Sequence, residues 1–241
     1  MDPKDRIIFA LDVPSLSEAE KYAGMLKDHV GVFKVGLELF VACGPAVIEA
    51  VKKSGQGIFL DMKFHDIPET VRGAMRSASA LGAEFITVHC DEGGALLKAA
   101  VEGNTGSAKV LGVTVLTSLS DESLKEIGID TNKYRTPLDL VLHRARLAKL
   151  AGCAGVVCSG HEVDSVKNEF GPDFIVVTPG IRSSGDAVGD QKRVVTPYEA
   201  IYNGADYIVV GRPIRKAHDP RKAAELIARE IGKALKDRRG D

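Results

Sequence analysis

The chain has 241 residues, of which 44% are apolar, and its 32 Lys and Arg nearly balance its 33 Asp and Glu. This balance excludes the basic excess typical of nucleic-acid-binding proteins, and the apolar content excludes a disordered chain. No apolar run approaches the roughly 18 residues of a membrane span, and residues 1–6 lack the apolar core of a signal peptide. The cysteines form no C-x-x-C motif and too few pairs for a disulfide framework: Cys43, Cys90, Cys153 and Cys158. We therefore expect a cytoplasmic globular protein that binds neither nucleic acid nor a membrane.

Eight short apolar runs, rich in Val, Ile and Phe, alternate with longer amphipathic segments along the chain. They are too short for helices, and most lack polar–apolar alternation, which is typical of strands buried on both faces. The runs cover residues 7–13, 32–37, 57–63, 84–89, 110–117, 155–158, 174–178 and 207–210. The first five begin 25 to 27 residues apart, which is the length of a strand, a helix and two short loops.

The amphipathic segments carry helix start and stop signals. Residues 15–18 read Ser-Leu-Ser-Glu, a capping-box pattern that predicts a helix beginning after Ser15. Pro68 and Pro220 each stand where a first helical turn is expected, and Gly82 is placed to end the helix that Pro68 begins.

Strands that alternate with helices, without a Pro- or Ser-rich linker, predict an α/β fold with a single domain over residues 1–241. Eight such units favour a closed (β/α)8 barrel, the TIM barrel, with its active site at the carboxyl ends of the strands. The alternative is an open parallel sheet. A dinucleotide-binding sheet would need a glycine-rich first turn, whereas residues 12–15 read Asp-Val-Pro-Ser.

Charged residues gather where the predicted strands end. Asp12 follows the first strand, Lys34 lies in the second, and Asp61, Lys63 and Asp66 surround the end of the third. Asp61 and Lys63 are two residues apart in a strand, so both side chains should project from the same face. An ion-pair cluster that merely closes the barrel would explain one such pair. Four or five charges at the same end of successive strands favour an active site instead.

Two Gly–Arg turns after the last strands predict a phosphate site. Gly180 and Arg182 follow the seventh strand, and Gly211 and Arg212 follow the eighth, where barrels often bind phosphate. Glycine lets backbone N–H groups approach an anion, and arginine adds a bidentate donor. Residues 182–191 are polar with two glycines, and we expect them to form either a lid over the anion or an ordinary surface loop.

We predict no metal site. His65 and His89 follow different strands, and no zinc-binding spacing surrounds them. Asp61 and Asp66 are conceivable magnesium ligands, but the ammonium of Lys63 between them would compete for the same carboxylates.

Six segments together resemble the orotidine 5'-phosphate decarboxylase family, over residues 6 to about 230 and in the family's order. The most specific is residues 61–70, Asp-Met-Lys-Phe-His-Asp-Ile-Pro-Glu-Thr. The others are residues 11–13, 34–36, 116–118, 178–182 with Gln191, and 210–213.

The resemblance implies decarboxylation of orotidine 5'-monophosphate to uridine 5'-monophosphate, the last step of de novo pyrimidine synthesis, without a cofactor. It implies that Lys63 stabilises charge at C6 and then protonates it, with Asp61, Lys34 and Asp66 completing an alternating charge chain. Asp12, Lys34 and Thr70 would bind the ribose, and Ile67 would lie near the leaving CO2. Either Thr117 or Ser118 would contact the base. Phosphate contacts would come from Arg182, Gln191, Gly211 and Arg212.

In this family the aspartate, isoleucine and threonine that match Asp66, Ile67 and Thr70 enter the neighbouring subunit's site. The resemblance therefore implies a homodimer with shared sites, while spacing alone also permits a monomer in which Asp66 folds back to Lys63. The nearest rivals are the magnesium-dependent 3-keto-L-gulonate 6-phosphate decarboxylases and hexulose-phosphate synthases, which carry a carboxylate where this chain has Lys34. A non-catalytic phosphate-binding barrel is a third reading, which the intact Lys63 disfavours.

Overall fold

The strands form one closed parallel barrel in the computed structural model, which describes residues 1–119, 121–182 and 193–240. Each strand pairs with the next, and β8 pairs back with β1 through Ile7 and Ile208, which closes the barrel. The bounds are β1 Ile7–Ala10, β2 Val32–Gly36, β3 Gly57–Phe64, β4 Phe85–His89, β5 Lys109–Val113, β6 Gly155–Val157, β7 Ile175–Thr178 and β8 Tyr207–Val210. This confirms the predicted TIM barrel and rules out the open sheet.

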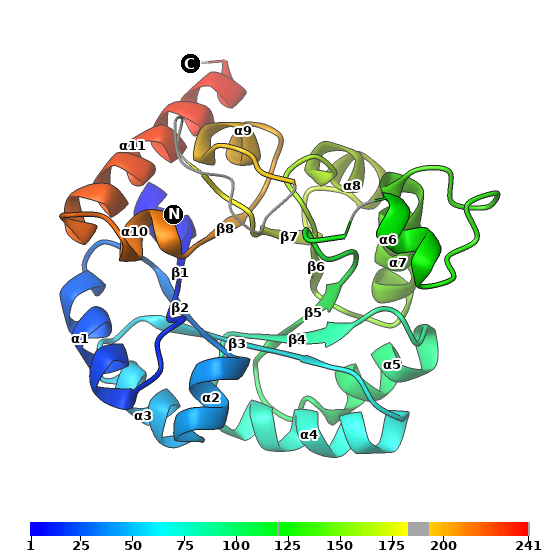
Figure 1. Ribbon diagram of the computed structural model, residues 1–241, viewed down its shortest axis with the longest axis horizontal. Coiled ribbons are helices and arrows are strands. Elements are labelled where there is room, and N and C mark those ends of the chain that lie inside the picture. Colours follow the sequence, from blue (N-terminus) through cyan, green and yellow to red (C-terminus); the bar gives the residue numbers. More distant parts are fainter. Residues whose placement is uncertain (120, 183–192, 241) are drawn as a thin grey trace.

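Helices surround the barrel, as Figure 1 shows along the barrel axis. Pro68 and Pro220 begin α4 and α11, and Gly82, with φ 69°, follows the end of α4, as predicted. Ser15 caps α1 by accepting the N–H of Glu18. The bounds are α1 Leu16–Leu26, α2 Leu37–Cys43, α3 Ala46–Lys52, α4 Pro68–Ala80, α5 Gly94–Gly103, α6 Asp121–Glu126, α7 Pro137–Leu150, α8 Val163–Phe170, α9 Pro197–Tyr202, α10 Arg212–Arg215 and α11 Pro220–Arg239, after a short 3-10 turn at Pro3–Arg6.

Two strands end three or more residues before the apolar pattern predicts. β1 ends at Ala10 rather than residue 13, and β5 ends at Val113 rather than residue 117. Leu11, Val13 and Val115 are nevertheless almost fully buried, because the chain stays packed under the helices after the strand pairing ends. An apolar run therefore marks burial, and burial continues past the last ladder hydrogen bond.

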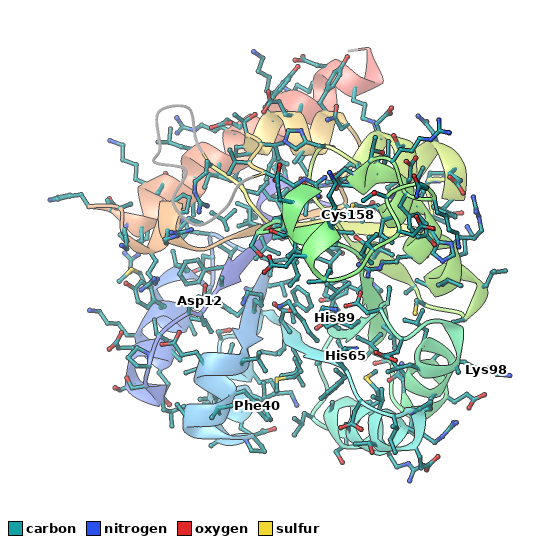
Figure 2. The ribbon with its side chains drawn as sticks, turned by 45° about the vertical axis from the view of Figure 1, so that its right-hand side comes forward. Asp12, Phe40, His65, His89, Lys98 and Cys158 are labelled. Carbon is teal, nitrogen blue, oxygen red and sulfur yellow. The ribbon has the colours of Figure 1, made fainter. Side chains whose placement is uncertain are left out.

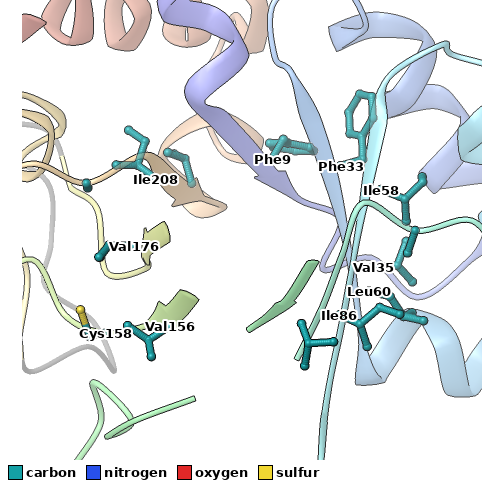
Figure 3. Close-up of a cluster of buried hydrophobic side chains, with 14 of the residues drawn as sticks. Phe9, Phe33, Val35, Ile58, Leu60, Ile86, Val156, Cys158, Val176 and Ile208 are labelled. Carbon is teal, nitrogen blue, oxygen red and sulfur yellow. The ribbon is translucent and has the colours of Figure 1, made fainter. Parts of the chain in front are cut away.

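Successive strand residues alternate between two apolar clusters. The outer cluster, shown in part in Figure 3, lies between strands and helices and includes Phe9, Phe33 and Leu60. The inner cluster fills the barrel with Ile8, Val32, Phe59, Phe85, Leu111, Val177 and Tyr207. On β2, β3 and β4 the inner positions nearer the carboxyl ends are polar: Lys34, Asp61 and Thr87 each stand two residues after a member of the inner cluster. The barrel interior is therefore apolar, with polar groups gathered at the carboxyl ends of these three strands.

The four cysteines are free thiols, in agreement with the absence of a disulfide framework, and Cys90, Cys153 and Cys158 are buried. Within the described ranges, no helix has both the length and the apolar character needed to cross a membrane.

Gly155 in β6 lies where the barrel leaves no room for a side chain. A Cβ at this position would overlap the carbonyl oxygen of Ile175 and lie 2.6 Å from its Cβ. We predict that Gly155→Ala lowers the free energy of unfolding by about 1–3 kcal/mol, the usual cost of overpacking, in a denaturant titration. Gly24→Ala is the matched control: Gly24 lies in α1 with open space around it, so the change should stabilise by about 0.5–1 kcal/mol. Equal stability of Gly155→Ala and the wild type would contradict the packing described here.

Candidate active site

A cavity of about 530 Å³ opens at the carboxyl ends of the strands. Its size is typical of a small-molecule site, and apolar inner residues such as Phe59 and Val157 form part of its wall. Nine of the predicted site residues line it: Asp12, Lys34, Asp61, Lys63, Thr117, Ser118, Arg182, Gly211 and Arg212. Thr117 is buried and Ser118 is exposed, yet both face this cavity, so the alternative between them stays open.

Four charged side chains alternate in sign across this cavity. The Lys34 ammonium lies 3.2 Å from Asp12 Oδ1 and 3.6 Å from Asp61 Oδ2. The Lys63 ammonium lies 2.6 Å from the same Oδ2 of Asp61. The adjacent strands β2 and β3 thus place two cations against one carboxylate, which is the convergence that the strand positions predict.

Asp61 is 8% exposed, and its ionised state depends on its neighbours. Burial by itself would raise the pKa of the Asp61 carboxyl. The charges of Lys34 and Lys63, with hydrogen bonds from Lys63 and Thr87, outweigh burial and hold that pKa below its ordinary value of 3.8. Asp61 is therefore a carboxylate at neutral pH.

Lys63 occupies an irregular part of β3. The ladder to β4 shifts register between Leu60 and Phe64, and Lys63 has φ 49°. It is the only non-glycine residue with positive φ in the part of the chain that the structure describes. A lysine in this region is strained by about 1–3 kcal/mol, and such strain tends to gather at functional sites. In this conformation the Lys63 ammonium contacts Asp61.

Thr87 in β4 is a site residue that the sequence analysis missed. It is fully buried, its hydroxyl donates to Asp61 Oδ1 at 3.0 Å, and it accepts the backbone N–H of Lys63 at 2.9 Å. The sequence does carry a signal for it: Thr87 is a polar residue two positions after Phe85 of the inner cluster, so its side chain faces the barrel interior.

Arginines from two strand ends line the same cavity. Arg182 follows β7, while Arg212 and Arg215 belong to α10, directly after β8. Gly211 brings this turn close to β1, since a Cβ there would lie 3.4 Å from the Cβ of Ala10 and 3.5 Å from Asp12 Oδ2. Three guanidinium groups facing one cavity suit an anionic ligand such as a phosphate. Arg215 was not predicted, because it follows the Gly–Arg turn by a helical turn rather than directly.

The structure does not bring every predicted residue into this cavity. Asp66 and Ile67 line a second, separate pocket of about 390 Å³, and Thr70 lies exposed in the first turn of α4. The carboxylate of Asp66 accepts the N–H of Ile67 at 2.6 Å. Residues 183–191 of the predicted lid, with Gln191 among them, lie outside the described residues.

The two histidines near the site contact carboxylates. His65 Nε2 lies 3.1 Å from Glu92, and His89 Nδ1 lies 3.4 Å from Asp91. Their rings lie side by side, 5.4 Å between centroids (Figure 2). Among residues 1–119, 121–182 and 193–240, no three His, Cys, Asp or Glu side chains gather to hold a metal ion.

Comparison with known proteins gives concordant matches over nearly the whole chain. Residues 5–227 match the model of the orotidine 5'-phosphate decarboxylase / HUMPS family. An orotidine 5'-phosphate decarboxylase of Desulfosudis oleivorans is 50% identical over 97% of this chain and 96% of its own. One from Anaeromyxobacter is 50% identical over 95% of this chain and 99% of its own.

Solved structures agree with these sequence matches. The crystal structure of orotidine 5'-phosphate decarboxylase from Lactobacillus acidophilus superposes with a TM-score of 0.79 at 37% identity, over 94% of this chain and 99% of that one. The Pyrococcus horikoshii enzyme gives a TM-score of 0.76 at 28% identity, with the same coverage. The family match and the identity to these relatives together show that the chain belongs to the orotidine 5'-phosphate decarboxylase family.

Proposed function

We propose that this chain decarboxylates orotidine 5'-monophosphate to uridine 5'-monophosphate and CO2, the last step of de novo pyrimidine synthesis, in the cavity at the barrel mouth. The observation that carries the proposal is the Lys34–Asp61–Lys63 cluster, which faces the three arginines across one cavity of nucleotide size. Family membership supports the choice of substrate.

The chemistry requires a cation and a proton at one point. When the bond from C6 to the carboxylate breaks, its electron pair stays on C6, where the ring delocalises it poorly. The Lys63 ammonium stabilises this charge and then transfers a proton to C6, leaving a neutral amine that solvent reprotonates. Asp61 holds Lys63 at 2.6 Å and lies close to where the substrate carboxylate must enter. Placement of both groups on β3 supports these roles.

Binding is divided along the cavity. We assign the phosphate to Arg182, Arg212 and Gly211, with Gln191 as a further donor. We assign the ribose hydroxyls to Asp12 and Lys34, together with Thr70 from the neighbouring subunit of the dimer proposed below. Thr117 or Ser118 contacts the base. Binding energy from the phosphate end can be used to bring the reacting carboxylate toward Asp61, because remote contacts are unchanged by the chemistry.

The position of Lys34 supports a metal-independent reaction. Its ammonium already lies between the carboxylates of Asp12 and Asp61, where a divalent cation sharing both ligands would have to sit. An ammonium and a divalent cation at one point would repel each other strongly. We therefore propose that no metal or organic cofactor takes part.

We also propose a two-fold homodimer with shared sites. Ile67 is 68% exposed, and Asp66 beside it is exposed as well. Transfer of Asp66, Ile67 and Thr70 into a partner's cavity would bury Ile67 and give Lys63 a second carboxylate. We propose further that residues 1–241 form one domain and that the protein is cytoplasmic.

The reaction is tested by treating the purified protein with EDTA and following the ultraviolet absorbance of orotidine 5'-monophosphate. We expect turnover without added metal, and a loss of more than about 100-fold in Lys63→Ala, which lacks the charge and the proton. Lys98→Ala, on the exposed face of α5, is the control and should retain full activity. Absence of turnover by the wild type would refute the proposal, and turnover restored only by Mg²⁺ would favour the magnesium-dependent relatives.

The phosphate assignment is tested by Arg212→Ala. A charge-assisted hydrogen bond contributes about 1.5–3 kcal/mol, so we expect uridine 5'-monophosphate to bind roughly 10- to 100-fold more weakly by calorimetry. Uridine, which lacks the phosphate, should bind the variant and the wild type equally. Arg146→Ala, on the surface of α7, should change neither affinity. Unchanged nucleotide affinity in Arg212→Ala would show that the phosphate lies elsewhere.

The shared site is tested by mixing two variants, Lys63→Ala and Asp66→Ala, each expected to be inactive alone. In a mixed dimer one site carries both defects and the other carries none, so an equal mixture should recover about a quarter of wild-type activity. Subunit exchange is verified separately with a tagged copy. A mixture that exchanges subunits and stays inactive would contradict the shared-site dimer.

A further inference from the structure

Thr87 is the single residue of β4 that lies opposite the irregular part of β3. Leu60 pairs with Ile86 and Phe64 pairs with Val88, so three residues of β3 face a single residue of β4, Thr87. The bulge removes ladder hydrogen bonds at the point where Lys63 takes its positive φ. The hydroxyl of Thr87 fills this gap, because it accepts the Lys63 N–H that the ladder leaves unpaired.

The direction of the two Thr87 hydrogen bonds is fixed by chemistry. A backbone N–H can only donate and an ionised carboxylate can only accept. The hydroxyl must therefore accept a hydrogen bond from the Lys63 N–H at 2.9 Å and donate its own hydrogen to Asp61 Oδ1 at 3.0 Å. One buried oxygen thus links the backbone of Lys63 to the carboxylate of Asp61.

Both oxygens of the Asp61 carboxylate are held, and by different groups. Oδ2 faces the ammonium groups of Lys63 and Lys34, while Oδ1 is held by Thr87. A carboxylate held only at Oδ2 could rotate about its last torsion, and the Lys63 ammonium would move with it. Because Thr87 also holds the Lys63 backbone, it fixes both ends of the Asp61–Lys63 pair.

We propose that Thr87 is a positioning residue for the reaction assigned above, holding the Asp61 carboxylate and the bulged Lys63 backbone in their reactive arrangement. The inference rests on the proposed function. Thr87 is fully buried and does not line the cavity, so it acts through these two residues rather than on the substrate. It should affect the chemical step more than substrate binding, which the distant arginines dominate.

Thr114 provides a matched control. It too is a buried threonine, and it directly follows the last residue of β5. Its hydroxyl donates to the carbonyl oxygen of Val157 at 2.9 Å. Replacing it by valine removes a buried hydroxyl hydrogen bond of similar length but touches neither Asp61 nor Lys63. A purely structural effect of losing such a bond would therefore be seen at Thr114 as well.

The experiment measures kcat and KM for orotidine 5'-monophosphate in four Thr87 backgrounds. Threonine and valine are similar in shape, but only threonine carries the hydroxyl. Serine and alanine are both smaller, and only serine carries the hydroxyl. We expect Thr87→Val and Thr87→Ala to lose about 10- to 100-fold in kcat, with KM within about threefold, since a displacement of about 1 Å has that effect on rate. Thr87→Ser should stay within about threefold of the wild type, and Thr114→Val should keep its kcat. Circular dichroism melts establish which variants are folded.

The outcomes separate this inference from the reaction itself. A wild type without turnover refutes the proposed function, whereas an active wild type with equal kcat in Thr87→Val refutes the role of Thr87. Equal kcat values in Thr87→Ser and Thr87→Ala also refute the role of Thr87. This comparison tests the role even if Thr87→Val does not fold. A matching loss of kcat in Thr114→Val would assign the effect to stability and would likewise overturn the inference.

Discussion

The buried carboxylate of Asp61 is the constraint on which the rest of the site depends. A carboxylate removed from water is costly unless it is paired and hydrogen-bonded, and Asp61 satisfies this through two ammonium groups and one hydroxyl. Each lysine is in turn held by a carboxylate: Lys34 by Asp12 and Asp61, and Lys63 by Asp61. The alternation of signs from Lys34 through Asp61 to Lys63 is therefore a condition of burying the Asp61 carboxylate between them.

The closed barrel makes this arrangement possible. Residues of alternate strand positions fill its interior, and the apolar inner cluster supports the charged positions directly above it. Lys63 keeps a strained φ of 49° because strand pairing on either side and the Thr87 hydroxyl restrict its backbone. A loop free to relax would move out of such a conformation. The rigid scaffold thus maintains strain at the residue that meets the reacting carbon in the proposed mechanism.

The sequence predicts the barrel and the charged centre well, for a physical reason. Periodicity and strand position report burial and side-chain direction, so the convergence of Lys34, Asp61 and Lys63 follows from their places in successive strands. The same logic assumes a regular strand, and it did not predict the bulge at Lys63. Thr87 escaped notice because threonine is common in strands and its importance arises only from pairing opposite that bulge.

Three other features of the site and fold could not be predicted from the sequence pattern. Arg215 reaches the cavity only through the turn of α10, which spacing along the sequence does not reveal. The two early strand ends were misplaced because Leu11 and Val115 remain buried after pairing stops. Whether Asp66 serves its own Lys63 or a partner's depends on a loop path that residue spacing leaves open.

The distribution of charge over the cavity explains how one site can both attract a substrate and repel part of it. Two lysines and two aspartates cancel at the barrel mouth, so the net positive charge comes from Arg182, Arg212 and Arg215. A nucleotide phosphate of about −2 is drawn to these arginines, whereas a carboxylate on the base enters a region without net charge, close to the ionised Asp61. In the proposed mechanism the two ends of the substrate therefore meet different surroundings: the arginines supply binding free energy, and part of it is used to bring the substrate carboxylate close to the like charge of Asp61. In the same mechanism, loss of CO2 removes that repulsion and leaves Lys63 beside the electron pair that it would protonate.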